Sequence, residues 1–258
     1  MRFPGRVLAS LALAATILAS LPSAAAANSV VNWRPCYGSA TAECYAVITD
    51  GESRSGSVVS NNYSQVTSAS AKVKVSCMTA PNNLAFVDNE LWLVTPPNPS
   101  GPLYHGTGWQ PEWLEAGITQ GEVNGTYVGT AFFYAIRYWS SGYHYLEYVI
   151  PGVVSMNTDY TFTIRWNSVG YWEVVLNGVI KARISNDNQA PGSHQAVQAG
   201  AEMLYAWGEI AGDVSALQYT MAGITYVYFG GPVDTDTRVF NLTANTNMHL
   251  GFATKTHC

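Results

Sequence analysis

The sequence predicts an all-β fold, an antiparallel β-sandwich or jelly roll that forms a single domain. Three observations predict it. The 258 residues include 16 Tyr, 8 Trp and 8 Phe, a composition suited to strands. Gly and Pro recur between short apolar segments, as they do in sheets joined by turns. No long segment carries the apolar period of a helix.

The expected strands are segments rich in β-branched and aromatic residues that end at turn residues. Taken in order, they are 44–50, 66–77, 89–95, 112–119, 129–139, 143–150, 159–167, 171–179, 196–207 and 223–230. Leu176-Asn177-Gly178 is a hairpin signal inside the eighth segment. The Pro-rich stretch 95–111 predicts a long loop at the rim of a groove. Short connections between strands favour antiparallel pairing.

Alternation assigns the side chains of four segments to two faces, because residues i and i+2 of a strand share a side. The residues expected to face the core are Leu91 and Leu93 in 89–95, Leu114, Ala116 and Ile118 in 112–119, Leu146 and Ile150 in 143–150, and Val197, Ala199, Ala201, Met203 and Tyr205 in 196–207. His144 is expected on the core side of 143–150 as a buried histidine. The opposite faces carry Trp113, Glu115 and Gly117; Gln198, Gly200 and Glu202; Trp92; and Tyr143, Tyr145 and Glu147. Isolated carboxylates among aromatic residues and glycines suit a binding groove.

The first 27 residues have the composition of a secretory signal peptide. Arg2 and Arg6 precede an apolar run at 7–21, and small residues follow it. The run is short for a membrane span. We therefore expect cleavage near Ala26 or Ala27 and a secreted β-sandwich domain at 28–258, without membrane contact.

The four cysteines predict two disulfides, since an even count in an exported protein favours pairing. Three pairings are possible. We favour Cys36–Cys44, which closes a short loop, and Cys77–Cys258, which ties down the C-terminus. A zinc site is disfavoured because no Cys-x-x-Cys pair exists.

Composition also narrows the class of function. The net charge is −5, and the 12 Lys and Arg residues form no basic cluster, which disfavours nucleic acid as a partner. Gly-x-Ser-x-Gly is absent, and the five His residues form no His-x-x-x-His pair. We expect no cofactor and no metal. The remaining candidates for chemistry are the 17 acidic residues.

Four short segments occur in a characteristic order: LWLVT, LEAGI, YLEYVIPG and QAGAEM. With their spacing, they resemble the glutamic peptidases of the eqolisin family and, more loosely, the neprosin family. NNYSQVTSASAKVKV and GITYVYF extend the resemblance over most of the mature chain. The resemblance implies a concanavalin A-like β-sandwich and a secreted acid endopeptidase that acts on polypeptides. We expect the protein to be a monomer.

The resemblance also implies roles for single residues. Glu202 matches the catalytic Glu, and Glu115 stands where eqolisins have a catalytic Gln, which departs from their pattern. A Glu/Glu dyad matches the pair attributed to neprosins. Trp92 matches a groove Trp, and Glu147 with the nearby Tyr145 matches a substrate-binding segment. The family's GIDG loop is replaced here by TPPNPSG, so its substrate contacts are not carried over.

Peptide hydrolysis without a covalent intermediate needs a base for water and a donor for the carbonyl oxygen. We assign the base to ionised Glu202 and the donor to protonated Glu115, although the reverse is open. Such a pair works at acid pH, where one proton is shared.

Two alternatives remain open. One is a jelly-roll glycoside hydrolase, and the other is a non-catalytic carbohydrate- or surface-binding module. Carboxyl groups near hydrogen-bonding distance favour the peptidase, whereas a separation of about 5 Å or more in an aromatic cleft favours a glycosidase. Carboxylates far apart favour binding alone.

Overall fold

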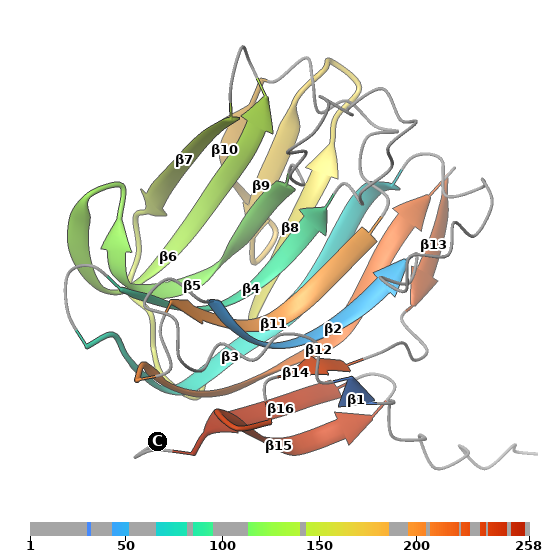
Figure 1. Cartoon of the computed structure of the whole chain (residues 1–258). Coiled ribbons are helices and arrows are strands. Elements are labelled where there is room, and N and C mark those ends of the chain that lie inside the picture. Colours follow the sequence, from blue (N-terminus) through green and yellow to red (C-terminus); the bar gives the residue numbers. More distant parts are fainter. Residues whose placement is uncertain are drawn as a thin grey trace, which may run out of the picture.

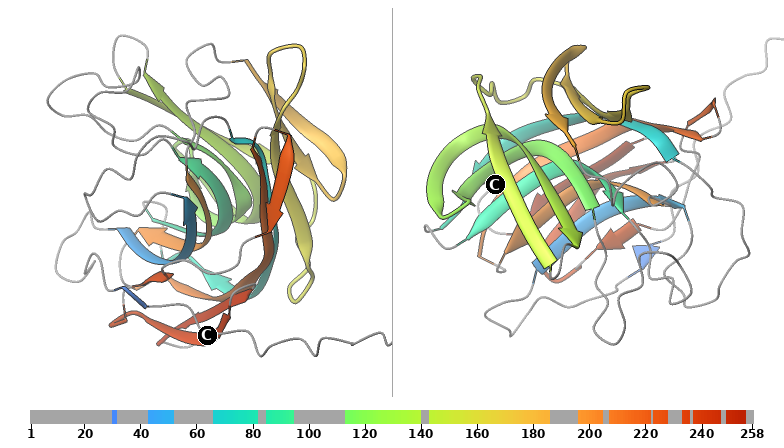
Figure 2. Two further views of the ribbon diagram at one scale, coloured as in Figure 1. Left: turned by 90° about the vertical axis from the view of Figure 1, so that its right-hand side faces the viewer. Right: turned by 90° about the horizontal axis from the view of Figure 1, so that it is seen from above.

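The computed structural model describes residues 30–31, 43–51, 66–81, 85–94, 113–139, 143–185, 196–204, 207–221, 223–227, 233–235, 237–246 and 249–255. Over these ranges the chain forms two sheets and no helix, so the predicted all-β sandwich is confirmed. Figures 1 and 2 show the sheets stacked face to face, with the first sheet curved. No described segment is a helix long and apolar enough to cross a membrane.

The first sheet carries the candidate site. Its spatial order is β1 (Val30–Val31), β14 (Val233–Thr235), β2 (Glu43–Gly51), β11 (Ala196–Leu204), β4 (Phe86–Val94), β5 (Trp113–Val123), β6 (Thr126–Trp139) and β7 (Tyr143–Ile150). Pairing is antiparallel except between β1 and β14. Strands β11, β4 and β5 lie in its middle, although β11 is more than 100 residues from β4 in the sequence.

The second sheet covers the inner face of the first. Its order is β10 (Val179–Ile184), β9 (Trp172–Leu176), β8 (Tyr160–Trp166), β3 (Val66–Thr79), β12 (Glu209–Met221), β16 (His249–Thr254) and β15 (Phe240–Thr246), and β13 (Ile224–Val227) also pairs with β12. A polar contact joins the two sheets: the buried Asn89 amide donates to the carbonyl oxygens of Lys74 (2.8 Å) and Asp213 (3.2 Å).

The predicted core faces of β4, β5 and β11 are confirmed, apart from Tyr205, which lies outside the described residues. The buried set shared by the two sheets includes Leu91, Leu93, Leu114, Ala116, Ile118, Val197, Ala199, Ala201 and Met203. The β7 assignment is partly wrong. Ile150 is buried and Leu146 packs against the core, but His144 is exposed and stacks on Tyr138 with ring centroids 5.2 Å apart. His144 is the second residue of an edge strand, where a side chain has less cover.

Several strands lie outside the expected set, and β12 is the longest of them. Its alternation breaks where the β3–β12 register shifts between Ser215 and Gln218. Ala216 there is exposed with φ 52°, so Val214 and Leu217 are both buried three residues apart. A β-bulge of this kind hides the period-2 pattern. The hairpin signal is confirmed, since the turn at 177–178 joins β9 to β10.

Two cysteines fall in the described strands. Cys44 in β2 and Cys77 in β3 are both disulfide-bonded. Cys36 and Cys258 lie outside the described residues, as do the predicted signal peptide and the loop at 95–111. The pairing Cys36–Cys44 and Cys77–Cys258 therefore stays a prediction.

Gly200 in β11 allows a close approach between strands. It pairs with Val47 of β2 on one side and with Glu90 of β4 on the other. Its φ is +151°, and a Cβ added there would overlap the carbonyl oxygen of Ala46. A glycine is therefore required at this position by both conformation and space.

We expect Gly200→Ala to lower the free energy of unfolding by about 2–4 kcal/mol, because the methyl group would force strand β11 away from β2. Urea denaturation would measure the change. Gly129→Ala is the matched control, since an added Cβ there meets nothing within 4 Å. We expect that control to shift stability by less than about 1 kcal/mol. Equal losses in both variants would contradict this account.

Candidate active site

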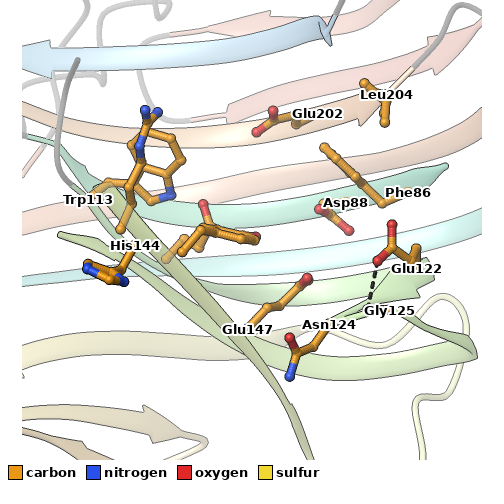
Figure 3. A pocket seen from close by; sticks show the side chains of 13 residues that line it. Phe86, Asp88, Trp113, Glu122, Asn124, Gly125, His144, Glu147, Glu202 and Leu204 are labelled. Carbon is orange, nitrogen blue, oxygen red and sulfur yellow. Dashed lines mark hydrogen bonds between the residues drawn. The ribbon is translucent and has the colours of Figure 1, made fainter. Parts of the chain in front are cut away.

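The outer face of the first sheet holds a groove of about 520 Å³. Figure 3 shows Glu202 of β11, Asp88 of β4 and Glu147 of β7 reaching into the same space. Among the described residues that line the groove, five are acidic and one, Arg137, has a permanent positive charge. The predicted site residues in this lining are Glu115, Glu147, Tyr145 and Glu202.

The pairing of β5 and β11 with β4 fixes the relative positions of Glu115 and Glu202 in the sheet. Glu90 of β4 pairs with Gly117 of β5 and with Gly200 of β11. Glu115 and Glu202 are therefore diagonal neighbours of Glu90, on opposite sides of β4. Since a diagonal neighbour lies about 7–8 Å away, the Cα atoms of Glu115 and Glu202 are roughly 15 Å apart. Both side chains stand on the groove face of the sheet, and strand β4 lies between them.

The two predicted catalytic residues each accept a hydrogen bond from a tyrosine. The hydroxyl of Tyr145 donates to Oε1 of Glu115 at 3.0 Å, and that of Tyr45 donates to Oε1 of Glu202 at 3.0 Å. Glu115 is buried, whereas Glu202 is half-buried. The two hydroxyl donors hold the carboxyl groups of Glu115 and Glu202 in a fixed orientation.

Glu147 lies in the same row of the sheet as Glu115. Both pair with Ala135 of β6, whose methyl side chain separates them. Glu147 is 7% exposed, and burial, followed by the charge of Glu115, raises its pKa to about 8. Glu147 therefore keeps its proton at neutral pH and can act as a proton donor to a group in the groove.

Two further carboxyl groups on β4 were not among the predicted site residues. Glu90 is 1% exposed and Asp88 5% exposed, and neither Oε2 of Glu90 nor Oδ1 of Asp88 has a hydrogen-bond partner. Burial raises the pKa of both well above the usual range, with Glu115 the next cause for Glu90 and Glu147 for Asp88. Asp88, Glu90 and Trp92 occupy alternate positions of β4, so the alternation that placed Trp92 on the groove face also predicts Asp88 and Glu90 there.

Aromatic side chains form one wall of the groove. The Arg137 guanidinium lies 4.6 Å from the centre of the Trp113 ring, and the rings of Trp113 and Tyr145 are 6.3 Å apart. Trp92, predicted to contact substrate, lies beside Glu115 but is 95% covered and does not line the groove. At the far end, the amide of Gly125 donates to Glu122 at 2.7 Å (Figure 3).

The neighbouring carboxyl groups of the groove can exchange protons. The His, Cys, Asp and Glu side chains of the described residues make no group of three or more suited to a metal ion. Neighbouring carboxyl groups of like charge instead share protons, so that some are acids while others are bases. The groove therefore has the components for acid–base hydrolysis by water.

Comparisons with known proteins add the following. No family model and no curated protein match the chain. Among solved structures, it is similar to Scytalido-glutamic peptidase with a peptide-based transition-state analogue (TM-score 0.46, 10% identity, 83% of this chain and 98% of that chain). It is also similar to SCP-B, a member of the eqolisin family, in complex with the tripeptide Ala-Ile-His (TM-score 0.43, 10% identity, 83% and 98%).

A third similar structure is a glycoside hydrolase of family 16 from Bacteroides ovatus in complex with a glucan product (TM-score 0.35, 12% identity, 73% of this chain and 67% of that chain). At such identities the likeness concerns the β-sandwich fold alone.

The raised pKa values predict that the protein is most stable in acid. A carboxyl group whose pKa is higher in the folded state binds more protons when folded, so its stabilising effect is present below the unfolded pKa and is lost as pH rises through the folded value. For Glu147 this window runs from 4.5 to about 8. We expect the melting temperature to fall across it.

Glu147→Gln should flatten that fall, because an amide cannot ionise. Thermal unfolding followed by circular dichroism between pH 4 and 9 would measure both proteins. A melting temperature that rises with pH over this window in the wild type would contradict the assignment.

Proposed function

We propose that the protein is a secreted acid endopeptidase of glutamic type, in which Glu202 and Glu115 hydrolyse a peptide bond with water. One observation carries the proposal: both residues line the same groove, each with a tyrosine donor, on opposite sides of Glu90. The ordered segments in the sequence, which resemble glutamic peptidases, support it. The export of the chain rests on the signal-like composition of residues 1–27.

The geometry suits a mechanism through bound water rather than a direct dyad. Because β4 lies between Glu115 and Glu202, a water molecule and the scissile carbonyl would lie in the groove between their carboxyl groups. The separation of the two residues, taken alone, favours a glycosidase. Glu202, which is less buried, takes a proton from the water while the oxygen adds to the carbonyl carbon. Glu115 gives its proton to the carbonyl oxygen. The tetrahedral intermediate then collapses as the proton on Glu202 passes to the amide nitrogen and the C–N bond breaks. The hydroxyl formed from the carbonyl oxygen returns its proton to Glu115, so both carboxyl groups regain their starting states.

The remaining groove residues would bind the polypeptide. Trp113 and Tyr145 offer aromatic surface, and the Tyr145 hydroxyl holds Glu115 in place. At acid pH the carboxyl groups are largely neutral, so the groove accepts an uncharged peptide backbone without strong repulsion.

Glycoside hydrolysis is the second candidate, and a specific observation favours it. Glu147, with a pKa of about 8, and Glu115 lie in one row of the sheet. A protonated acid and a carboxylate held near each other are the two groups that glycosidases use. The wall of Trp113 and Tyr145 would stack on sugar rings.

A peptide-library digest between pH 3 and 7 tests the first proposal. We expect Glu202→Gln to reduce cleavage at least about 100-fold, because the base is lost. Glu115→Gln should retain more activity, since an amide can still donate to the carbonyl oxygen. Glu209→Gln, on the second sheet, is the matched control and should be unchanged. Undiminished cleavage by Glu202→Gln would overturn the dyad.

A polysaccharide digest separates the two candidates. If the protein is a glycosidase, Glu147→Gln should abolish the release of reducing sugar, because the proton donor to the leaving oxygen is lost. If it is a peptidase, the wild type should release none, and Glu147→Gln should change peptide cleavage less than Glu202→Gln does. Sugar release that depends on Glu147 would replace the peptidase proposal.

A further inference from the structure

We propose that Glu90 is a positioning residue for the proposed hydrolase: a protonated carboxyl group beneath the groove that bridges Glu115 and Glu202 and supplies hydrogen bonds to the ionised partner. This inference rests on the proposed function for its kinetic role. Its central claim, that Glu90 stays neutral in the folded protein, depends on the structure alone.

The position of Glu90 follows from its cross-strand neighbours. Gly117 and Gly200 flank it on either side, so no side chain separates it from the two diagonal neighbours, Glu115 and Glu202. At Gly117 an added Cβ would overlap the Cβ of Glu90 itself. Because neither glycine carries a side chain, the carboxyl group of Glu90 can reach toward either catalytic residue.

The burial of Glu90 is incompatible with a free charge. It is 1% exposed, and its Oε2 has no hydrogen-bond partner. An ionised carboxylate in that state would carry a large desolvation penalty, whereas a neutral acid has one O–H to donate and needs less compensation. The unpartnered oxygen is available to a neighbouring carboxylate.

The ionisable groups that face Glu90 come from each strand around it. They are Asp88 on β4, Glu115 on β5, Glu147 on β7 and Glu202 on β11. The Tyr45 hydroxyl donates to Glu202, and the Tyr145 hydroxyl donates to Glu115. All four charged neighbours are acidic, and Arg137 lies against the Trp113 ring. Burial, then Glu115, raises the pKa of Glu90 well above its usual range.

A neutral Glu90 has a defined consequence for the reaction. While it holds its proton, it can stabilise the negative charge of whichever catalytic residue is ionised. When Glu90 loses its proton at higher pH, a further negative charge appears between Glu115 and Glu202, which disfavours charge on the tetrahedral oxygen. Glu90 therefore sets the alkaline limit of activity without touching the substrate.

The test compares Glu90→Gln, Glu90→Ala and the control Glu209→Gln in the full-length chain. An amide keeps a neutral donor but cannot ionise. We expect Glu90→Gln to retain activity within about threefold at acid pH and to move the alkaline limb of the pH–rate profile upward, whereas Glu90→Ala should lose at least about tenfold in kcat with little change in KM. An alkaline limb that does not move in Glu90→Gln would overturn the kinetic role.

An infrared pH titration tests the protonation state without any substrate. The carbonyl band of protonated carboxyl side chains should persist at neutral pH in the wild type, should weaken in Glu90→Gln, and should be unchanged in Glu209→Gln. A band of equal strength in the wild type and Glu90→Gln would overturn the inference. If no peptide is cleaved by any protein, the proposed function fails, while the infrared result still decides whether Glu90 is neutral.

Discussion

Mutual repulsion among carboxyl groups is the constraint on which the candidate site depends. Asp88, Glu90, Glu115, Glu147 and Glu202 share one face of one sheet. In a partly buried groove they cannot all ionise, so protons must be distributed among them. The depth of each carboxyl group governs that distribution, because burial keeps Glu90 neutral, while the tyrosine hydroxyls orient Glu115 and Glu202.

The fold makes this arrangement possible because one face of the first sheet packs into the core while the other face forms the groove. On β4, β5 and β11, every second residue packs into the core, and the stability of the sandwich comes from that side. The intervening positions are then open to residues that a core would reject. Gly117 and Gly200 show the cost of the arrangement, since each gives up side-chain packing to let a neighbouring strand approach.

Local patterns predicted the faces of these strands well, because alternation depends on a few consecutive residues. Strand register could not be predicted in the same way. The diagonal relation of Glu115 and Glu202 depends on β4 lying between β5 and β11, which is a long-range pairing. The bulge at Ala216 concealed β12, and the edge position of β7 exposed His144. The positions of Asp88 and Glu90 on the groove face could have been predicted, because they alternate along β4 in step with Trp92.

Asn89 stands on the opposite face of β4 from Asp88 and Glu90, and its amide binds backbone oxygens of β3 and β12. The strand that carries the central carboxyl groups is thereby pinned to the other half of the sandwich. Sliding of one sheet over the other would break these two hydrogen bonds before it disturbed the acidic cluster. The arrangement of the acidic cluster therefore depends on the packing of the two sheets as well as on the pairing within one sheet.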